Sequence, residues 1–189
     1  TGGTGYIGSH TIVDLINNGF EVICIDNLSR SKAYSLTGIE KITGKKPTFY
    51  QIDLCDKEAT LQVIGEHKDA VGIIHFAAYK AVGESVEQPL EYYDNNIGSL
   101  VNLLQMAVQY QVKHFIFSSS CTVYGEPNII PVTEATEIQN ATSPYGDTKI
   151  ICERIIASQV QAKNKLKAVL LRYFNPIGAH QSSLIGELS

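Results

Sequence analysis

The sequence has no long hydrophobic run, no excess of positive charge and no closely spaced pair of cysteines. No apolar stretch among its 189 residues approaches the roughly 20 residues that a membrane-spanning helix needs. The formal net charge of −4 argues against nucleic acid or an anionic membrane surface as the main partner. The four cysteines, Cys24, Cys55, Cys121 and Cys152, lie far apart and are expected to be reduced and mostly buried. We therefore expect a cytoplasmic protein without nucleic-acid or membrane partners.

The histidines do not form a metal-binding pattern. His10, His67, His114 and His180 lack the spacing of a metal site, so no metal is expected. His75 lies in an apolar run and is expected to be a core histidine rather than a base. Neither an internal repeat nor a low-complexity tract is present. A content of 44% hydrophobic and 18% charged residues is typical of a globular domain, and the length allows one substantial core.

Short β-branched runs alternate with helical patterns along the chain. This alternation predicts an α/β fold, a doubly wound parallel sheet (Rossmann), with ligands at the C-terminal strand ends. The expected strands are residues 21–25, 48–52, 72–76, 114–117 and 168–172, and the expected helices are an apolar one ending at Gly19, 56–67, 92–111 and one from Tyr145.

Glycines at three-residue spacing open the chain and precede the first helical pattern. Gly2, Gly5 and Gly8 permit a tight turn in which backbone N–H groups approach a pyrophosphate at the helix N-terminus. Asp26 follows 18 residues after Gly8, at the end of the next predicted strand. A carboxylate there accepts hydrogen bonds from a ribose and repels a 2′-phosphate, which favours NAD over NADP. A purely structural glycine turn is the alternative.

Tyr145 and Lys149 are one helical turn apart and share a helix face. An ammonium near a phenol, aided by a positively charged cofactor ring, favours the phenolate, so the pair predicts a tyrosine base with a lowered pKa. The same spacing is common on exposed helices, so the hypothesis depends on what lies nearby. Ser120 follows a predicted strand, and Asn175 follows another.

The chain begins within the glycine loop, where a preceding strand is expected. We expect a fragment in which residues 1–175 form an NAD-binding domain without its first strand, and 176–189 begin a truncated substrate domain.

Seven motifs in order resemble the extended short-chain dehydrogenase/reductase family and, within it, the nucleotide-sugar 4-epimerases. They are TGGTGYIGSH at 1–10, DNLS at 26–29, HFAAYKAVGES at 75–85, PLEYYDNN at 89–96, FSSSCTVYG at 117–125, SPYGDTK at 143–149 and LRYFNPIGAH at 171–180.

The resemblance implies a reversible 4-epimerisation of UDP-glucose and UDP-galactose, in a protein that is a homodimer at full length. Bound NAD would accept the C4 hydride of a UDP-hexose, and the 4-keto intermediate would take it back on its other face. Tyr145 would take the hydroxyl proton, Lys149 would hold the nicotinamide ribose, and Ser120 would hydrogen-bond the reacting oxygen. Ser120, Tyr145 and Asn175 would contact the substrate. The implied cofactor-binding residues are Gly2, Gly5, Tyr6, Ile7, Gly8, Asp26, Asn27, Asp53, Leu54, Phe76, Ala77, Ala78, Lys80, Asn95, Tyr145, Lys149 and Phe174.

Several positions depart from the family pattern. Arg30 could contact an adenosine-side phosphate or lie in solvent, and solvent is the expectation. Tyr79 is bulkier than the usual residue and could alter packing near the cofactor. Asp147 should lie on the far side of its helix from Tyr145 and Lys149. Residues 181–183 and 188–189 also differ from the pattern.

Other functions remain open. A 4,6-dehydratase would be expected to have an acidic pair after the serines, whereas residues 121–124 contain no carboxylate. A decarboxylase of the same family is a further alternative. A non-catalytic NAD- or sugar-binding sensor on the same fold is also conceivable. Such a sensor would not need Ser120, Tyr145 and Lys149 together.

Overall fold

The sheet consists of two parallel parts. The computed structural model describes residues 1–162 and 165–187. In the first part, β1 (Ile23–Ile25) pairs with β2 (Thr48–Tyr50). In the second, β3 (Gly72–His75), β4 (His114–Ser120) and β5 (Lys167–Tyr173) lie in the order β3-β4-β5. All pairings are parallel, so the C-terminal ends of the strands share one edge.

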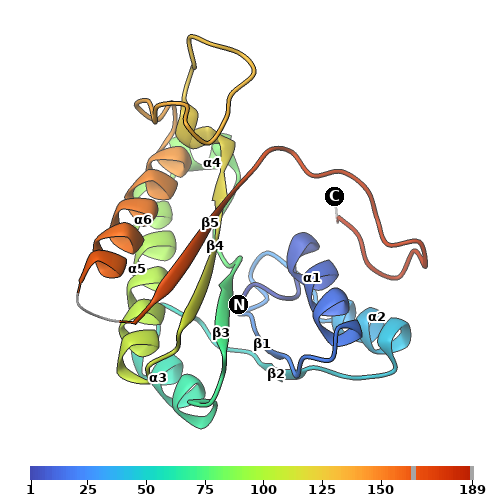
Figure 1. The fold of residues 1–189 in the computed structure, drawn as a ribbon. Coiled ribbons are helices and arrows are strands. Elements are labelled where there is room, and N and C mark those ends of the chain that lie inside the picture. Colours follow the sequence, from blue (N-terminus) through green and yellow to red (C-terminus); the bar gives the residue numbers. More distant parts are fainter. Residues whose placement is uncertain (163–164, 188–189) are drawn as a thin grey trace.

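Helices cover both faces of the strands. Figure 1 shows α3, α5 and α6 on one side of the longer sheet, with α1 and α2 on the other. The predicted α/β doubly wound class is therefore confirmed. The helices are α1 (Tyr6–Asn17), α2 (Tyr34–Thr43), α3 (Lys57–Glu66), α4 (Val82–Glu87), α5 (Pro89–Gln109) and α6 (Pro144–Gln161), with a 3₁₀ turn η1 at Cys121–Tyr124.

The first two residues connect the two parts of the sheet. The Thr1 nitrogen donates to the Ile74 carbonyl at 2.7 Å, and the Phe76 nitrogen donates to the Thr1 carbonyl at 3.0 Å. On the other side, the Gly2 nitrogen donates to the Ile25 carbonyl at 2.8 Å. Thr1 and Gly2 therefore have the hydrogen bonds of a strand end between β1 and β3.

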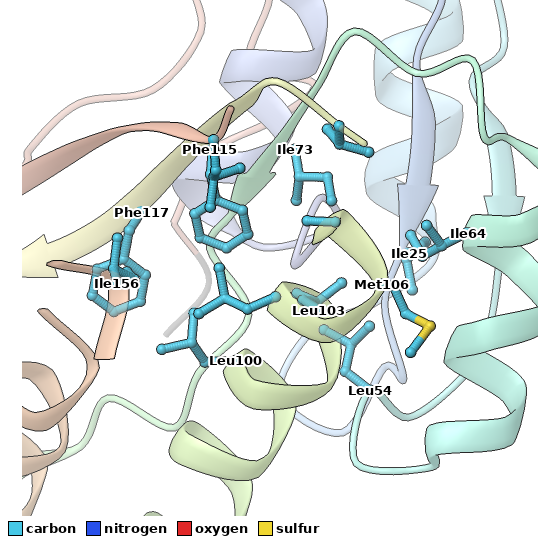
Figure 2. Close-up of a cluster of buried hydrophobic side chains, with 14 of the residues drawn as sticks. Ile25, Leu54, Ile64, Ile73, Leu100, Leu103, Met106, Phe115, Phe117 and Ile156 are labelled. Atoms are coloured by element: carbon cyan, nitrogen blue, oxygen red, sulfur yellow. The ribbon is translucent and has the colours of Figure 1, made fainter. Parts of the chain in front are cut away.

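The main core lies between the longer sheet and the helices α3, α5 and α6 (Figure 2). Alternate β4 residues Phe115 and Phe117 point into it, and Leu100 and Leu103 of α5 are fully buried against them. Burying side chains of this size stabilises the fold by about 1.5–3 kcal/mol each. A second cluster joins α1 and α2 and includes Ile185 from the C-terminal segment. The two clusters hold the helices on opposite faces of the sheet.

Most predicted elements differ from the structure by one to three residues at their ends, and two helices were not predicted. β4 continues through Ser120, whereas the serines were expected to follow the strand. α5 begins at Pro89 rather than Tyr92, because proline fits the first helical position, where no N–H is needed. The helices α2 and α4 were not predicted, and α4 has only six residues. The departure at residues 188–189 lies outside the described residues.

His75 is a core histidine, as predicted. It is 2% exposed, its Nδ1 lies 2.8 Å from the Thr1 hydroxyl, and its ring stacks on Phe117. Burial lowers its pKa well below the usual value, so it is neutral at pH 7.

All four cysteines are free thiols. Cys24 and Cys152 are buried, but Cys55 and Cys121 are only half-buried. The expectation of mostly buried cysteines therefore holds for two of the four. Within the described part of the chain, no helix combines the length and apolar character needed to cross a membrane.

Candidate functional site

A cleft of about 730 Å³ runs along the C-terminal edge of the strands. It is bounded by the start of α1, the loop after β1, the strand ends and the start of α6. Every residue that the sequence analysis assigned to the site lines this cleft, although its individual role stays a prediction. These residues are Gly2, Gly5, Tyr6, Ile7, Gly8, Asp26, Asn27, Asp53, Leu54, Phe76, Ala77, Ala78, Lys80, Asn95, Ser120, Tyr145, Lys149, Phe174 and Asn175.

The glycine loop lies too close to other backbone for side chains. Gly2 has φ +67°, and a Cβ there would lie 2.5 Å from the Ala77 nitrogen. A Cβ on Gly8 would lie 2.2 Å from the Gly2 carbonyl oxygen. The loop leads directly into α1, whose N-terminus has no side-chain cap and no acidic residue in its first turn. These free N–H groups and the helix dipole suit an anionic phosphate group.

Asp26 connects the glycine loop to the loop after β1. Its Oδ2 accepts from the Thr4 nitrogen at 3.2 Å, and its Oδ1 accepts from the Leu28 nitrogen at 2.9 Å and the Ser31 hydroxyl at 3.0 Å. The side chain is nearly buried but borders the cleft. A carboxylate at this edge would accept hydrogen bonds from a ribose and repel a phosphate.

α6 places Tyr145 and Lys149 in the cleft. The Ser143 hydroxyl accepts from the Gly146 nitrogen at 3.2 Å, and Pro144 occupies the first turn. This serine cap and N-terminal proline fix where the helix begins. Both side chains face the cleft, one turn apart, as the spacing predicted.

The Lys149 ammonium is buried and has a defined acceptor. The residue is 3% exposed, and its Nζ donates to the Ser118 carbonyl at 2.8 Å. The nitrogen also lies 4.8 Å from the Phe117 ring centroid. Burial lowers the pKa of Lys149 to about 8, so the side chain is still largely protonated at pH 7.

The groups of the protein alone do not lower the Tyr145 pKa. Burial raises the pKa of the phenol, and only the neighbouring Ser120 hydroxyl opposes that shift. The Lys149 ammonium lies 5.8 Å from the Tyr145 ring centroid and donates to the Ser118 carbonyl. Desolvation of the phenolate is therefore the largest influence on this pKa, and the hydrogen bond with Ser120 does not reverse it. The helix supplies the geometry of a base but not its pKa.

A buried ion pair supports the strand and helix that carry these residues. Arg172 donates from Nε to Glu153 Oε1 at 3.0 Å and from Nη2 to Oε2 at 2.8 Å. The Ser119 hydroxyl donates to the same carboxylate at 2.5 Å, and Arg172 Nη1 donates to the Tyr124 hydroxyl at 3.1 Å. Glu153 is 4% exposed. This bidentate network ties β4, η1, α6 and β5 together around the cleft.

Sequence reasoning missed this network and one further group. Glu153 follows Lys149 by four residues on the same helix face, which was an available signal. Thr122 lines the cleft just after Ser120, and its hydroxyl is buried without a partner among the described residues. A buried polar atom of this kind is free to bond a molecule in the cleft. No sequence pattern distinguished Thr122 from its neighbours.

The departures Arg30, Tyr79 and Asp147 all have contacts within the fold. Arg30 was expected to lie in solvent. It is exposed, but its Nη2 also pairs with Glu84 Oε1 at 2.8 Å and its guanidinium lies over the Tyr79 ring. Asp147 accepts from the Tyr93 hydroxyl of α5 at 2.7 Å and does not line the cleft, which agrees with its predicted orientation.

The segment after β5 passes along one side of the cleft. The Tyr6 hydroxyl donates to the Gly178 carbonyl at 2.6 Å, and Ile185 packs into the α1–α2 cluster. Lys80, predicted to contact the cofactor, forms an exposed ion pair with Glu187 at 3.0 Å. This segment therefore packs on the helices beside the glycine loop.

The cleft of this parallel sheet has a glycine loop suited to an anion at one end and a serine, a tyrosine and a lysine at the other. This arrangement is typical of dinucleotide-dependent enzymes. The chain matches the NAD dependent epimerase/dehydratase family over residues 1–188 and belongs to that family.

Two curated relatives are named UDP-glucose 4-epimerase. The protein of Haemophilus influenzae is 50% identical over 187 residues, covering 99% of this chain and 55% of the relative. The protein of Caenorhabditis elegans is 48% identical over 196 residues, covering 99% of this chain and 56% of the relative. The chain thus spans about half the length of the curated relatives it matches.

Solved structures show the same fold. UDP-glucose 4-epimerase of Bifidobacterium longum, in complex with NAD+ and UDP, is similar at a TM-score of 0.96 and 46% identity, covering 98% of this chain and 55% of that one. UDP-glucose-4-epimerase of Stenotrophomonas maltophila, with bound NAD and formylated UDP-arabinopyranose, has a TM-score of 0.95 and 42% identity. The match covers 100% of this chain and 55% of that one.

The crowded position of Gly8 generates a stability prediction. Gly8→Ala would place a methyl group 2.2 Å from a backbone oxygen, so we expect a loss of about 1–3 kcal/mol in the free energy of unfolding, measured in urea. Gly83→Ala is the control, because a Cβ in α4 meets nothing within 4 Å. Equal stability of the two variants would contradict the crowding.

The Glu153–Arg172 pair generates a second prediction. Glu153→Ala should lower the free energy of unfolding by about 3–5 kcal/mol, because it leaves the Arg172 charge largely buried and unpaired. Arg154→Ala, exposed on the same helix, should change it by less than about 0.5 kcal/mol. The double variant Glu153→Leu/Arg172→Leu should be more stable than Glu153→Ala. A small loss in Glu153→Ala would show that the pair does not hold α6 to β5.

Proposed function

We propose that the protein containing this chain interconverts UDP-glucose and UDP-galactose by 4-epimerisation, with NAD as a bound cofactor. The observation that carries the proposal is that Ser120, Tyr145 and Lys149 converge in the cleft that begins at the glycine loop. The similarity to UDP-glucose 4-epimerases supports the choice of substrate. Residues 121–124 offer no carboxylate for an elimination, which disfavours a dehydratase.

The cleft residues fit NAD. The backbone of the glycine loop and the α1 N-terminus would bind its pyrophosphate, since a Cβ at Gly2 or Gly8 would collide with the backbone there. Asp26 and Asn27 would contact the adenosine ribose, and Phe174 would lie against the nicotinamide. When bound, NAD would supply the oxidation and re-reduction of the sugar carbon.

The chain's own residues would handle the proton and the orientation of the sugar. Tyr145 would accept the proton from the C4 hydroxyl oxygen of the substrate. Ser120 would donate a hydrogen bond to that oxygen, and Asn175 would contact the nucleotide sugar. Lys149, held at the Ser118 carbonyl, would contact the nicotinamide ribose while keeping a positive charge near the reacting oxygen.

We further propose that residues 1–175 form the NAD-binding domain and that later residues begin a substrate domain. A further strand between β1 and β3 would complete the domain, and the hydrogen bonds of Thr1 and Gly2 on both sides of that position support it.

We also propose that the full-length protein is a homodimer and that it is cytoplasmic. Analytical ultracentrifugation and cell fractionation test these two proposals, and a monomer or a membrane-bound protein would contradict them.

Tyr145→Phe should reduce turnover of UDP-galactose by at least about 100-fold, because the variant has no general base at the C4 hydroxyl. The measurement is UDP-glucose formation by the purified whole protein, together with its NAD content. Tyr93→Phe is the matched control, because it removes a tyrosine hydroxyl that bonds Asp147 outside the cleft. We expect Tyr93→Phe to contain as much NAD as the parent, and the turnover of each variant is expressed per bound NAD.

Undiminished turnover in Tyr145→Phe would remove its assignment as the base. A parent protein that neither holds NAD nor converts UDP-hexoses would overturn the proposed function. The 189-residue chain alone is expected to be inactive, because it spans about half of its relatives' length, and turnover by this piece would contradict that expectation.

A further inference from the structure

A group of four side chains crosses one side of the cleft. We call Arg30, Tyr79, Glu84 and Tyr92 the Arg30 cluster. Arg30 belongs to the loop after β1, Tyr79 follows β3, Glu84 is on α4 and Tyr92 is on α5. Arg30, Tyr79 and Glu84 line the cleft, next to Asp26 and the glycine loop. The cluster therefore joins the two walls of the cleft near the predicted adenosine site.

Arg30 makes two contacts with the opposite wall. Its Nη2 donates to Glu84 Oε1 at 2.8 Å, and its Cζ lies 4.5 Å from the centroid of the Tyr79 ring. A planar guanidinium can stack on an aromatic face and pair with a carboxylate through its in-plane N–H groups at the same time. The two contacts define one position for the Arg30 side chain.

The groups that receive Arg30 are themselves fixed. Tyr92 is 1% exposed, and its hydroxyl donates to Glu84 Oε2 at 2.7 Å while accepting from the Ala81 nitrogen at 3.1 Å. The Tyr79 backbone is held on both sides by the buried Asn96 side chain, at 2.8 Å through its nitrogen and 3.0 Å through its carbonyl. Arg30 therefore meets a preformed acceptor and a preformed aromatic face.

The other wall is held mainly by bonds within its own loop and by the bond from Asn27 to Asp53. The loop after β1 turns at Leu28, which has φ 61°, and Ser29 and Arg30 are exposed beyond it. Asp26 holds the base of this loop through Leu28 and Ser31. Arg30 is the point at which the outer part of the loop reaches α4. Its charge is matched by Glu84, so it is poorly placed to attract a phosphate in the cleft.

We propose that Arg30 is a positioning residue that closes the adenosine side of the cleft by tying the loop after β1 to α4, and so slows the release of the cofactor. In this role Arg30 acts through Glu84 and Tyr79, not through a contact with the cofactor phosphates. The inference rests on the proposed function, because it requires that NAD occupies the cleft. It concerns retention of the cofactor, and not the chemical step.

The test measures how fast NAD leaves the purified whole protein, by trapping the released cofactor with an excess of an NAD-consuming dehydrogenase. Arg30→Ala and Glu84→Gln should both speed release, roughly fivefold, because each removes one side of the same contact. The double variant Arg30→Ala/Glu84→Gln should release NAD about as fast as Arg30→Ala, because both changes break the same contact. Lys32→Ala is the control, because it removes a positive charge from the same loop at an exposed position.

Two further readouts distinguish positioning from general destabilisation. Turnover at saturating NAD and the melting temperature of the NAD-free variants should match those of the parent. A lower turnover together with a lower melting temperature in Arg30→Ala would show a structural role and overturn the proposal.

Glu84→Gln decides between closure and direct binding. If Arg30 bound a cofactor phosphate, freeing it from Glu84 would leave release unchanged or slower, which would overturn the proposal. Release at the parent rate in Arg30→Ala would overturn it as well, while leaving the proposed function intact. A parent that never contains NAD would contradict the proposed function and this inference together.

Discussion

The buried ammonium of Lys149 is the constraint on which the rest of the site depends. A lysine this deep in the protein is costly unless its charge has a partner, and the Ser118 carbonyl provides one at 2.8 Å. That bond fixes α6 against β4, so Tyr145, one turn earlier, has its place in the cleft. The Glu153–Arg172 pair, one turn later, ties the same helix to β5. Ser119, between Ser118 and Ser120, joins that pair from the strand.

The two ends of the cleft are built in different ways. At the glycine loop, the site consists of backbone groups, and there is no room for side chains at Gly2 and Gly8. At the start of α6, it consists of side chains whose charges and hydroxyls are positioned by buried bonds. Parallel strands bring both ends to one edge of the sheet. A long ligand with an anionic group in its middle and a reactive group at one end fits a cleft with these two ends.

Features that depend on local spacing could be predicted from the sequence. The glycine triplet, Asp26 and the pair Tyr145 and Lys149 follow fixed offsets, and all lie in the cleft as expected. Features that depend on residues far apart could not. Arg30 and Glu84 are 54 positions apart, and nothing in either motif indicates that they pair.

The effect of burial on the pKa of Tyr145 could not be predicted for a related reason. Spacing along a helix indicates which groups are neighbours, but burial decides which charge state is favoured, and burial depends on the whole fold. In this structure burial raises the pKa of the phenol. If Tyr145 is the base, the lowering has to come from the positively charged nicotinamide ring of bound NAD, together with Lys149.

The most direct test of this account is a spectroscopic titration of the Tyr145 phenol in the whole protein, as the absorbance difference between the parent and Tyr145→Phe. The account predicts a pKa above the ordinary value of about 10 without NAD, and a pKa at least about two units lower with NAD bound. The same pKa in both states, or a phenolate already present at neutral pH without NAD, would contradict it.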